Sequence, residues 1–206
     1  MRIFVSHASS NKEIVLKFAA LLENINNEIE VFCSSENGSI KVGENFVETI
    51  FTELDNSDIF IPVISEEYYK SKFCMIELGV ACSYLYNKYK KNGEDYIYPF
   101  ALYPIVKGQA LSGTPITSLQ TGDIADEVDI HNFIQAAFEE KGLSIGAGVN
   151  RKLHKYKFEI DKIIFIGELS LDGKINKVDG VFNIIDKTTD YASSISDKII
   201  SVISNF

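Results

Sequence analysis

Residues 57–79 read "SDIFIPVISEEYYKSKFCMIELG" and predict a buried strand followed by an apolar helix. Residues 58–65 form an almost continuous apolar run, which is typical of a strand that is buried on both faces of a parallel sheet. The helix is predicted over residues 73–85, where most residues are apolar or small and Glu77 is the only charged one. The segment therefore predicts an α/β protein and raises the question of what one carboxylate does in an apolar helix.

The same alternation of strands and helices continues on both sides of this segment. Strands are predicted at residues 2–6, 28–35 and 95–105, and helices at residues 11–25, 44–57 and 125–142, the last one ending at a glycine. Because each crossover helix must pack back onto the sheet, this order predicts a doubly wound α/β fold, with a parallel sheet and helices on both faces.

The pattern changes after Gly142. Residues 142–150, "GLSIGAGVN", are glycine-rich and are predicted to be a linker. A helix is predicted over residues 151–164, a turn at 170–174 and a terminal amphipathic helix over 184–206. We therefore divide the chain into a domain at residues 1–142 and a mostly helical C-terminal extension at residues 143–206. The apolar stripe of the terminal helix must be covered in water, so it packs either on its own domain or against another subunit.

The composition excludes several classes of partner. The net charge of −9 disfavours binding to phosphate backbones, so we expect no nucleic-acid partner. No apolar run approaches the ~20 residues of a membrane span, so we expect no membrane anchor. Cys33, Cys74 and Cys82 are an odd set without a CxxC pair, which is typical of a reducing compartment. These features together favour a cytoplasmic protein.

Common motifs for cofactors and metals are missing from the sequence. The "GAG" at 146–148 lacks the third glycine and the preceding strand of a dinucleotide-binding fingerprint, and there is no GxxxxGK[ST] motif. A phospho-accepting receiver domain needs an aspartate at the end of its third strand, where this chain has Ser65. His7, His131 and His154 are scattered and form no HExxH pattern. We therefore expect neither a metal site nor a cofactor.

Ligands of doubly wound sheets bind at the carboxyl ends of the strands. In this chain those ends correspond to residues 6–11, 33–45 and 65–73, which are rich in hydroxyl, amide and glycine groups. Such groups suit contacts to phosphate and ribose, although surface loops commonly have this composition whatever they bind. The sequence thus indicates where a ligand would bind without identifying it.

Glu77 is predicted to be at least partly shielded near the start of its helix. At 3.6 residues per turn, the residues on or beside its face are Phe73, Val80, Ala81 and Tyr84. A purely structural explanation is also open, because a glutamate is favoured near a helix N-terminus and Glu77 could pair with Lys72.

Four blocks of the sequence carry a family resemblance. They are "IFVSHASSNK" (3–12), "ENGSIKVGENF" (36–46), "SDIFIPVISEEYYKSKFCMIELG" (57–79) and the proline-containing strand at 95–105. In this order they resemble a bacterial TIR (Toll/interleukin-1 receptor) domain over about residues 2–140, which implies the flavodoxin-like form of the α/β fold. Bacterial and plant members of that family cleave the nicotinamide–ribosyl bond of NAD+ with a glutamate in a W-C-x-x-E-L block. Residues 73–78 match this block with phenylalanine in place of tryptophan.

The resemblance implies roles for individual residues. Glu77 would be the catalytic carboxylate, and Cys74 and Phe73 would line the site. The other implied site residues are Ser6, His7 and Ala8, which would form the floor of the nucleotide pocket, and Ile40 and Gly43, in a loop at 36–43 that would reach a neighbouring TIR protomer. The loop departs from the family pattern at Val42, where a proline is common, and Ser35 stands where many members have an acidic residue.

The function that the resemblance implies is NAD+ cleavage for a nucleotide signal in bacterial antiphage defence. NAD+ would be the substrate, and the product would be ADP-ribose or a cyclic ADP-ribose, detected by a downstream effector. Self-association through TIR surfaces would accompany this activity. The alternative is a non-catalytic module that binds only other TIR domains, and the retention of Glu77 favours the enzyme.

Overall fold

The computed structural model describes residues 1–33, 46–88, 96–146, 148–164, 167–169 and 175–177. The chain divides into two compact units, Met1–Ile163 and Ile164–Phe206. In the second unit, β6 (Gly167–Leu169) and β7 (Ile175–Lys177) form an antiparallel pair. The predicted turn at 170–174 and the predicted terminal helix at 184–206 lie outside the described residues.

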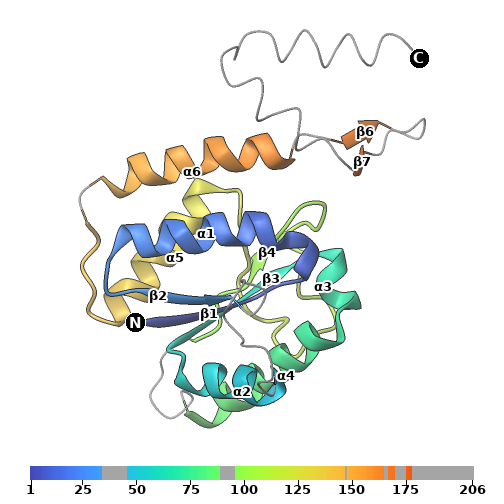
Figure 1. Cartoon of the computed structure of the whole chain (residues 1–206), viewed down its shortest axis with the longest axis vertical. Coiled ribbons are helices and arrows are strands. Elements are labelled where there is room, and N and C mark those ends of the chain that lie inside the picture. The colour runs from blue at the N-terminus through green and yellow to red at the C-terminus, as the bar shows by residue number, and fades with distance from the viewer. Residues whose placement is uncertain (34–45, 89–95, 147, 165–166, 170–174, 178–206) are drawn as a thin grey trace, which may run out of the picture. The chain divides into compact units, whose positions relative to one another are not determined.

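The first unit contains a parallel five-stranded sheet (Figure 1). Its strands are β1 (Arg2–Ser6), β2 (Glu30–Cys33), β3 (Ile59–Ile64), β4 (Phe100–Ala101) and β5 (Gly122–Asp123). They lie in the order β2-β1-β3-β4-β5, and every neighbouring pair is parallel. This is the strand order of flavodoxin-like proteins, so the predicted doubly wound α/β fold is confirmed.

Helices cover both faces of this sheet. Figure 1 shows α1 (Lys12–Ile25), α5 (Glu127–Glu140) and α6 (Val149–Ile164) on one face, and α2 (Phe46–Asn56) and α4 (Lys72–Lys88) on the other. A short helix that the sequence analysis did not predict, α3 (Glu66–Lys70), connects β3 to α4. None of the described helices is both long and apolar enough to cross a membrane.

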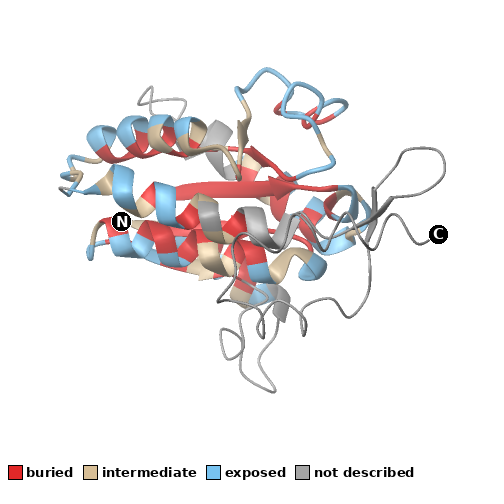
Figure 2. Cartoon of the chain, turned by 90° about the horizontal axis from the view of Figure 1, so that it is seen from above, coloured by how far each residue is buried: buried red, intermediate tan, exposed pale blue. Residues whose placement is uncertain are grey.

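The central strands are the most deeply buried part of the molecule. All six residues of β3 are buried, which confirms the prediction that this strand is covered on both faces. Ile3, Phe4 and Val5 of the neighbouring β1 are completely inaccessible. Figure 2 shows this buried sheet enclosed between helices whose outer sides are exposed. Because the central strands are packed on both faces, the residues at their carboxyl ends are held in defined positions.

The fourth strand is shorter than the predicted range of 95–105. Only Phe100 and Ala101 form regular ladder pairs, with an isolated bridge between Ile97 and Phe60. Pro99 and Pro104 flank this pair, and proline has no N–H to donate to a ladder. Ile97 and Leu102 are therefore buried without belonging to a regular strand, whereas Tyr103 is exposed.

The helix α5 ends at a glycine, as predicted. Gly142 has a positive φ of 69°, and its N–H donates to the Glu139 carbonyl at 3.0 Å. The N–H of Leu143 donates to the Phe138 carbonyl at 2.8 Å, which completes the capping of the last turn. A glycine is favoured here because the left-handed conformation strains residues that carry a Cβ.

The helix α6 is packed against the rest of the first unit. Leu153, Tyr156 and Ile160 are buried, and the Tyr156 hydroxyl donates to the Ile124 carbonyl at 2.9 Å. The Tyr156 ring also lies 6.1 Å from the ring of Phe18 in α1. The compact unit therefore continues past the predicted domain boundary at Gly142 by one helix.

Candidate functional site

Glu77 lies on the buried side of α4 and is only 3% exposed. Cys74, Leu78 and Ala81 share this side, so the prediction that the carboxylate is shielded is confirmed. Phe73, which was predicted to lie on or beside this face, is 53% exposed. At 100° per residue, Phe73 lies about 90° from the centre of the buried arc, whereas Glu77 lies within it.

The carboxylate of Glu77 meets the end of β1. The Ser6 hydroxyl donates to Glu77 Oε2 at 2.5 Å, and both side chains are buried. This distance is at the short end of the range for a hydroxyl that donates to an ionised carboxylate. Two predicted site residues that are 71 positions apart in the sequence are thus brought into direct contact at the carboxyl edge of the sheet.

Tyr68 of α3 joins this pair and was missed by the sequence analysis. Its hydroxyl lies 3.0 Å from Ser6 Oγ, and it can also donate to the Cys74 carbonyl at 3.3 Å. Complete burial raises the pKa of Tyr68 well above its ordinary value, so the phenol stays protonated. The signal for α3 was Ser65, directly after the buried strand, because a serine there can cap a helix by accepting from Tyr68 N–H.

His7 and Ala8 are buried beside Ser6. The pKa of His7 is lowered from 6.5 to about 4, mainly by desolvation and to a smaller extent by the positive charge of Lys12, while the hydrogen bond with the Val5 carbonyl raises it. His7 Nδ1 lies 3.4 Å from that carbonyl oxygen. The imidazole is therefore neutral at neutral pH and supplies no positive charge to the site.

Cys74 is buried next to Glu77 in the first turn of α4. Desolvation raises the pKa of its thiol to about 11, and the negative charge of Glu77 contributes to this rise. The thiol is thus protonated at neutral pH, which makes it a poor nucleophile. The carbonyl of Cys74 contacts Tyr68, so this residue shapes the site mainly through its backbone and its volume.

Two of the predicted site residues, Ile40 and Gly43, lie outside the described residues, together with the whole loop at 36–43. Within the described part of the chain, no group of three or more His, Cys, Asp or Glu residues is arranged to hold a metal ion. The described site therefore offers one carboxylate, two hydroxyl groups, one protonated thiol and a neutral imidazole.

A family model described as the TIR domain matches residues 3–140, which is about two thirds of the chain. The chain belongs to the TIR domain family. The matched range contains the five-stranded sheet, apart from Arg2 at the start of β1, and all of the site residues named above. No curated protein matches the chain.

Solved structures of TIR domains are also similar to this chain. The TIR domain of the Toll-related receptor TRR-2 from Hydra magnipapillata is 19% identical, with a TM-score of 0.49, and the match covers 67% of this chain and 95% of that one. The TIR domains of the activated Roq1 resistosome, which directly recognizes the pathogen effector XopQ, are 15% identical, with a TM-score of 0.44. That match covers 90% of this chain and 98% of the other.

The geometry of this TIR domain places its buried carboxylate where doubly wound sheets bind ligands. Ser6 ends β1, and Tyr68 lies in the helix that follows β3, so the hydroxyl groups beside Glu77 lie at or just after the ends of two adjacent strands. A carboxylate held in this way is oriented before any ligand arrives. It can stabilise positive charge that develops on a bound molecule.

Proposed function

We propose that this TIR domain cleaves the nicotinamide–ribosyl bond of NAD+ and that Glu77 is its catalytic residue. The observation that carries this proposal is the buried contact between the Glu77 carboxylate and the Ser6 hydroxyl at the carboxyl edge of the sheet. Residues 73–78 resemble the glutamate block of TIR enzymes, and the burial of Glu77 fits a group that acts on a substrate rather than on solvent.

The leaving group explains why one carboxylate is enough. Ordinary glycosidases use one acid to protonate the leaving oxygen and a second carboxylate on the other side of the sugar. Nicotinamide starts as a positively charged pyridinium and leaves as a neutral molecule, so it needs no proton. What the enzyme must stabilise is the positive charge that develops on the ribose, and a preorganised anion does this.

The other groups at the site agree with a mechanism that uses a single carboxylate. The thiol of Cys74 and the phenol of Tyr68 are protonated at neutral pH, and the imidazole of His7 is neutral. None of these three side chains brings a formal charge that would compete with Glu77 for the cationic ribose. Ser6 holds the carboxylate in place by donating its proton to Oε2.

Two outcomes of the cleavage are compatible with this chemistry. Water can complete the reaction and give ADP-ribose, or a nucleophile within the substrate, its adenine or a ribose hydroxyl, can close a cyclic ADP-ribose. The proposed role is a nucleotide signal in bacterial antiphage defence, made in the cytoplasm and detected by a downstream effector. Self-association through the loop at 36–43 would complete the site of a neighbouring protomer.

A non-catalytic TIR–TIR interaction module is the second candidate function. It is favoured by adjacent exposed apolar residues on α4, since Phe73 is 53% exposed and Ile76 is 49% exposed. Exposed apolar residues that lie together commonly mark interaction surfaces. This surface is also compatible with an enzyme that assembles, so NAD+ turnover decides between the two functions.

The test is incubation of the purified chain with NAD+, followed by chromatographic separation of the products. The enzyme proposal predicts loss of NAD+ with release of one nicotinamide per NAD+ consumed, together with ADP-ribose or a cyclic isomer. The same chromatogram identifies the product. Unchanged NAD+ at high protein concentration, from a sample shown to be folded, would favour the interaction module.

A further inference from the structure

A buried chain of hydroxyl groups ends at the carboxylate of Glu77. Tyr68 OH lies 3.0 Å from Ser6 Oγ, and Ser6 Oγ lies 2.5 Å from Glu77 Oε2. Tyr68 and Ser6 are completely inaccessible to solvent, and Glu77 is 3% exposed. The three residues come from α3, β1 and α4, so the chain connects three separate elements at the same edge of the sheet.

The number of protons limits the possible directions of these hydrogen bonds. Each hydroxyl has one proton, and an ionised carboxylate can only accept. If Ser6 donates to Glu77, its oxygen is left to accept, and Tyr68 OH can donate to it at 3.0 Å. The other acceptor of the single Tyr68 proton is the Cys74 carbonyl, which is farther away at 3.3 Å. If Ser6 donated to Tyr68 instead, its proton would no longer point at the carboxylate. Hydrogen bonds that follow one another in this way also polarise each other in a buried environment.

Tyr68 itself is held by its surroundings. Its backbone N–H donates to Ser65 Oγ at 3.1 Å, and the Ser65 hydroxyl donates to Asn11 Oδ1 at 2.8 Å. Its ring packs against Tyr69 in an edge-on arrangement, with 6.3 Å between ring centres. These contacts hold the phenol in one position, and its burial keeps water from forming hydrogen bonds to its hydroxyl. The hydroxyl can therefore orient Ser6.

We infer that Tyr68 is a positioning residue for NAD+ cleavage, whose hydroxyl directs the single proton of Ser6 to Glu77 and so holds the carboxylate in one orientation. This inference rests on the proposed function of Glu77. The Ser6 hydroxyl lies between the Tyr68 hydroxyl and the Glu77 carboxylate in this arrangement, so we expect Tyr68 to act on the chemical step rather than on the binding of the substrate. Its effect must therefore depend on the presence of Ser6.

The test is a double-mutant cycle in the full chain with Tyr68→Phe, Ser6→Ala and the combination of the two. Tyr68→Phe should lower kcat for NAD+ about tenfold, with KM changed less than about twofold, since one buried hydrogen bond contributes on this scale. Tyr68→Phe should cause a clearly smaller loss when Ser6 is already alanine, because only its bond to the Cys74 carbonyl is then left to lose. The matched control is Tyr156→Phe, which removes another buried hydroxyl, one that donates to the Ile124 carbonyl. The control should keep the wild-type kcat.

The possible results separate this inference from the proposed function. If the wild type cleaves NAD+ but the two substitutions reduce kcat independently, or if Tyr68→Phe behaves like Tyr156→Phe, the positioning role is wrong and the proposed function stands.

If the wild type does not cleave NAD+, the proposed function fails and the positioning role fails with it. In that case, unfolding temperatures test whether the hydrogen-bond chain exists. The decrease in unfolding temperature of the double variant should be smaller than the sum of the decreases in the two single variants. Additive losses there would show that Tyr68 and Ser6 are not coupled at all.

Discussion

At the scale of single residues, the site depends on contacts that lie far apart in the sequence. Ser6 and Glu77 could each be predicted as site residues from the short motifs around them. Their mutual contact could not, because it depends on how α4 is set against the end of β1, and a one-residue rotation of the helix moves a side chain by 100°. The same uncertainty applies to exposure, because Phe73, one turn before Glu77, is 53% exposed whereas Glu77 is 3% exposed.

A prediction for His7 follows from its burial as a neutral group. Its pKa is about 4 in the folded chain and near 6.5 when unfolded, so between these values the unfolded chain binds the extra proton. The free energy of unfolding should therefore fall as pH decreases from 6.5 to 4, by about 3 kcal/mol from this residue alone. Urea unfolding of the wild type and of His7→Asn at several pH values measures the difference.

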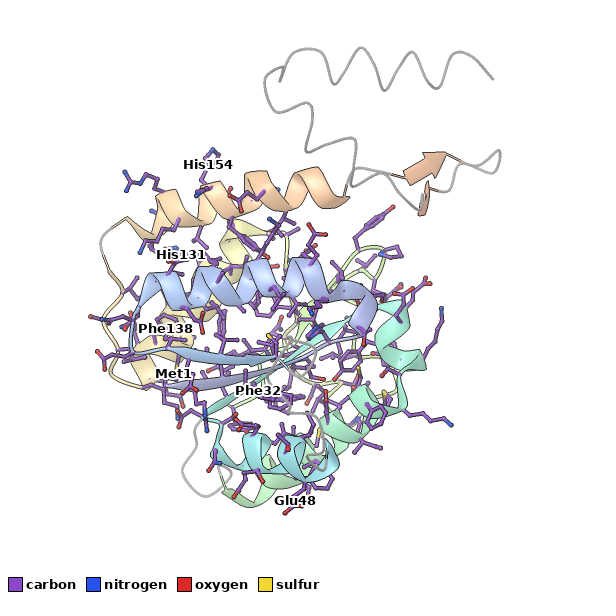
Figure 3. All side chains as sticks on the ribbon, in the orientation of Figure 1. Met1, Phe32, Glu48, His131, Phe138 and His154 are labelled. Atoms are coloured by element: carbon purple, nitrogen blue, oxygen red, sulfur yellow. The ribbon has the colours of Figure 1, made fainter. Side chains whose placement is uncertain are left out.

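The control for this prediction is His154→Asn. The His154 side chain is 82% exposed, and Figure 3 shows it on the outer side of α6. Its removal should leave the pH dependence of the wild type almost unchanged, because exposed charges contribute little to stability. If His7→Asn had the same pH dependence as the wild type, the assignment of His7 as a buried neutral group would be wrong.

At the scale of helices and strands, long periodic segments could be predicted and short ones could not. The helices α1, α2, α4, α5 and α6 and the strands β1 to β3 were predicted close to their observed bounds, because each contains either an apolar period or a long apolar run. The strand β5 has only two residues, Gly122 and Asp123, and carries no such pattern. The helix α3 has five residues, and its formation depends on capping by Ser65 rather than on periodicity.

The helix α6 provides a prediction at this scale. Ile160 is completely buried, so Ile160→Ala should lower the free energy of unfolding by about 2–5 kcal/mol, which is the usual cost of removing a large aliphatic side chain from a core. His154→Ala on the outer side of the same helix should change stability by no more than about 0.5 kcal/mol. Denaturant unfolding monitored by circular dichroism measures both. Equal, small effects would show that α6 is not part of the core of the first unit.

At the scale of the whole molecule, two truncations test where the folded TIR unit ends. A chain that stops after Ile163 should keep the unfolding temperature of the first unit, because it retains the buried residues of α6. A chain that stops after Gly142 loses Leu153, Tyr156 and Ile160 and should unfold at a lower temperature or aggregate. Equal stability of the two truncated chains would show that α6 is dispensable.

The full chain also allows a test of self-association. If a loop from one protomer completes the site of another, NAD+ turnover per molecule should rise with protein concentration over about a hundredfold range. Measuring turnover and sedimentation on the same samples links the activity to the assembled species. Constant turnover per molecule from a protein that remains a monomer throughout would rule out a shared site.

The most direct measurement of the central claim compares NAD+ consumption by the wild type and by Glu77→Gln. The substitution keeps the shape of the side chain and an acceptor oxygen for Ser6 but removes the negative charge. Loss of an electrostatic catalytic group typically costs about 10² to 10³ in rate, so the variant should lose almost all turnover while its circular dichroism spectrum and unfolding temperature stay close to those of the wild type. Glu66→Gln, on the exposed surface of α3, is the matched control and should keep full activity. A folded Glu77→Gln variant that retains more than about a tenth of the wild-type rate would contradict the assignment of Glu77 as the catalytic carboxylate.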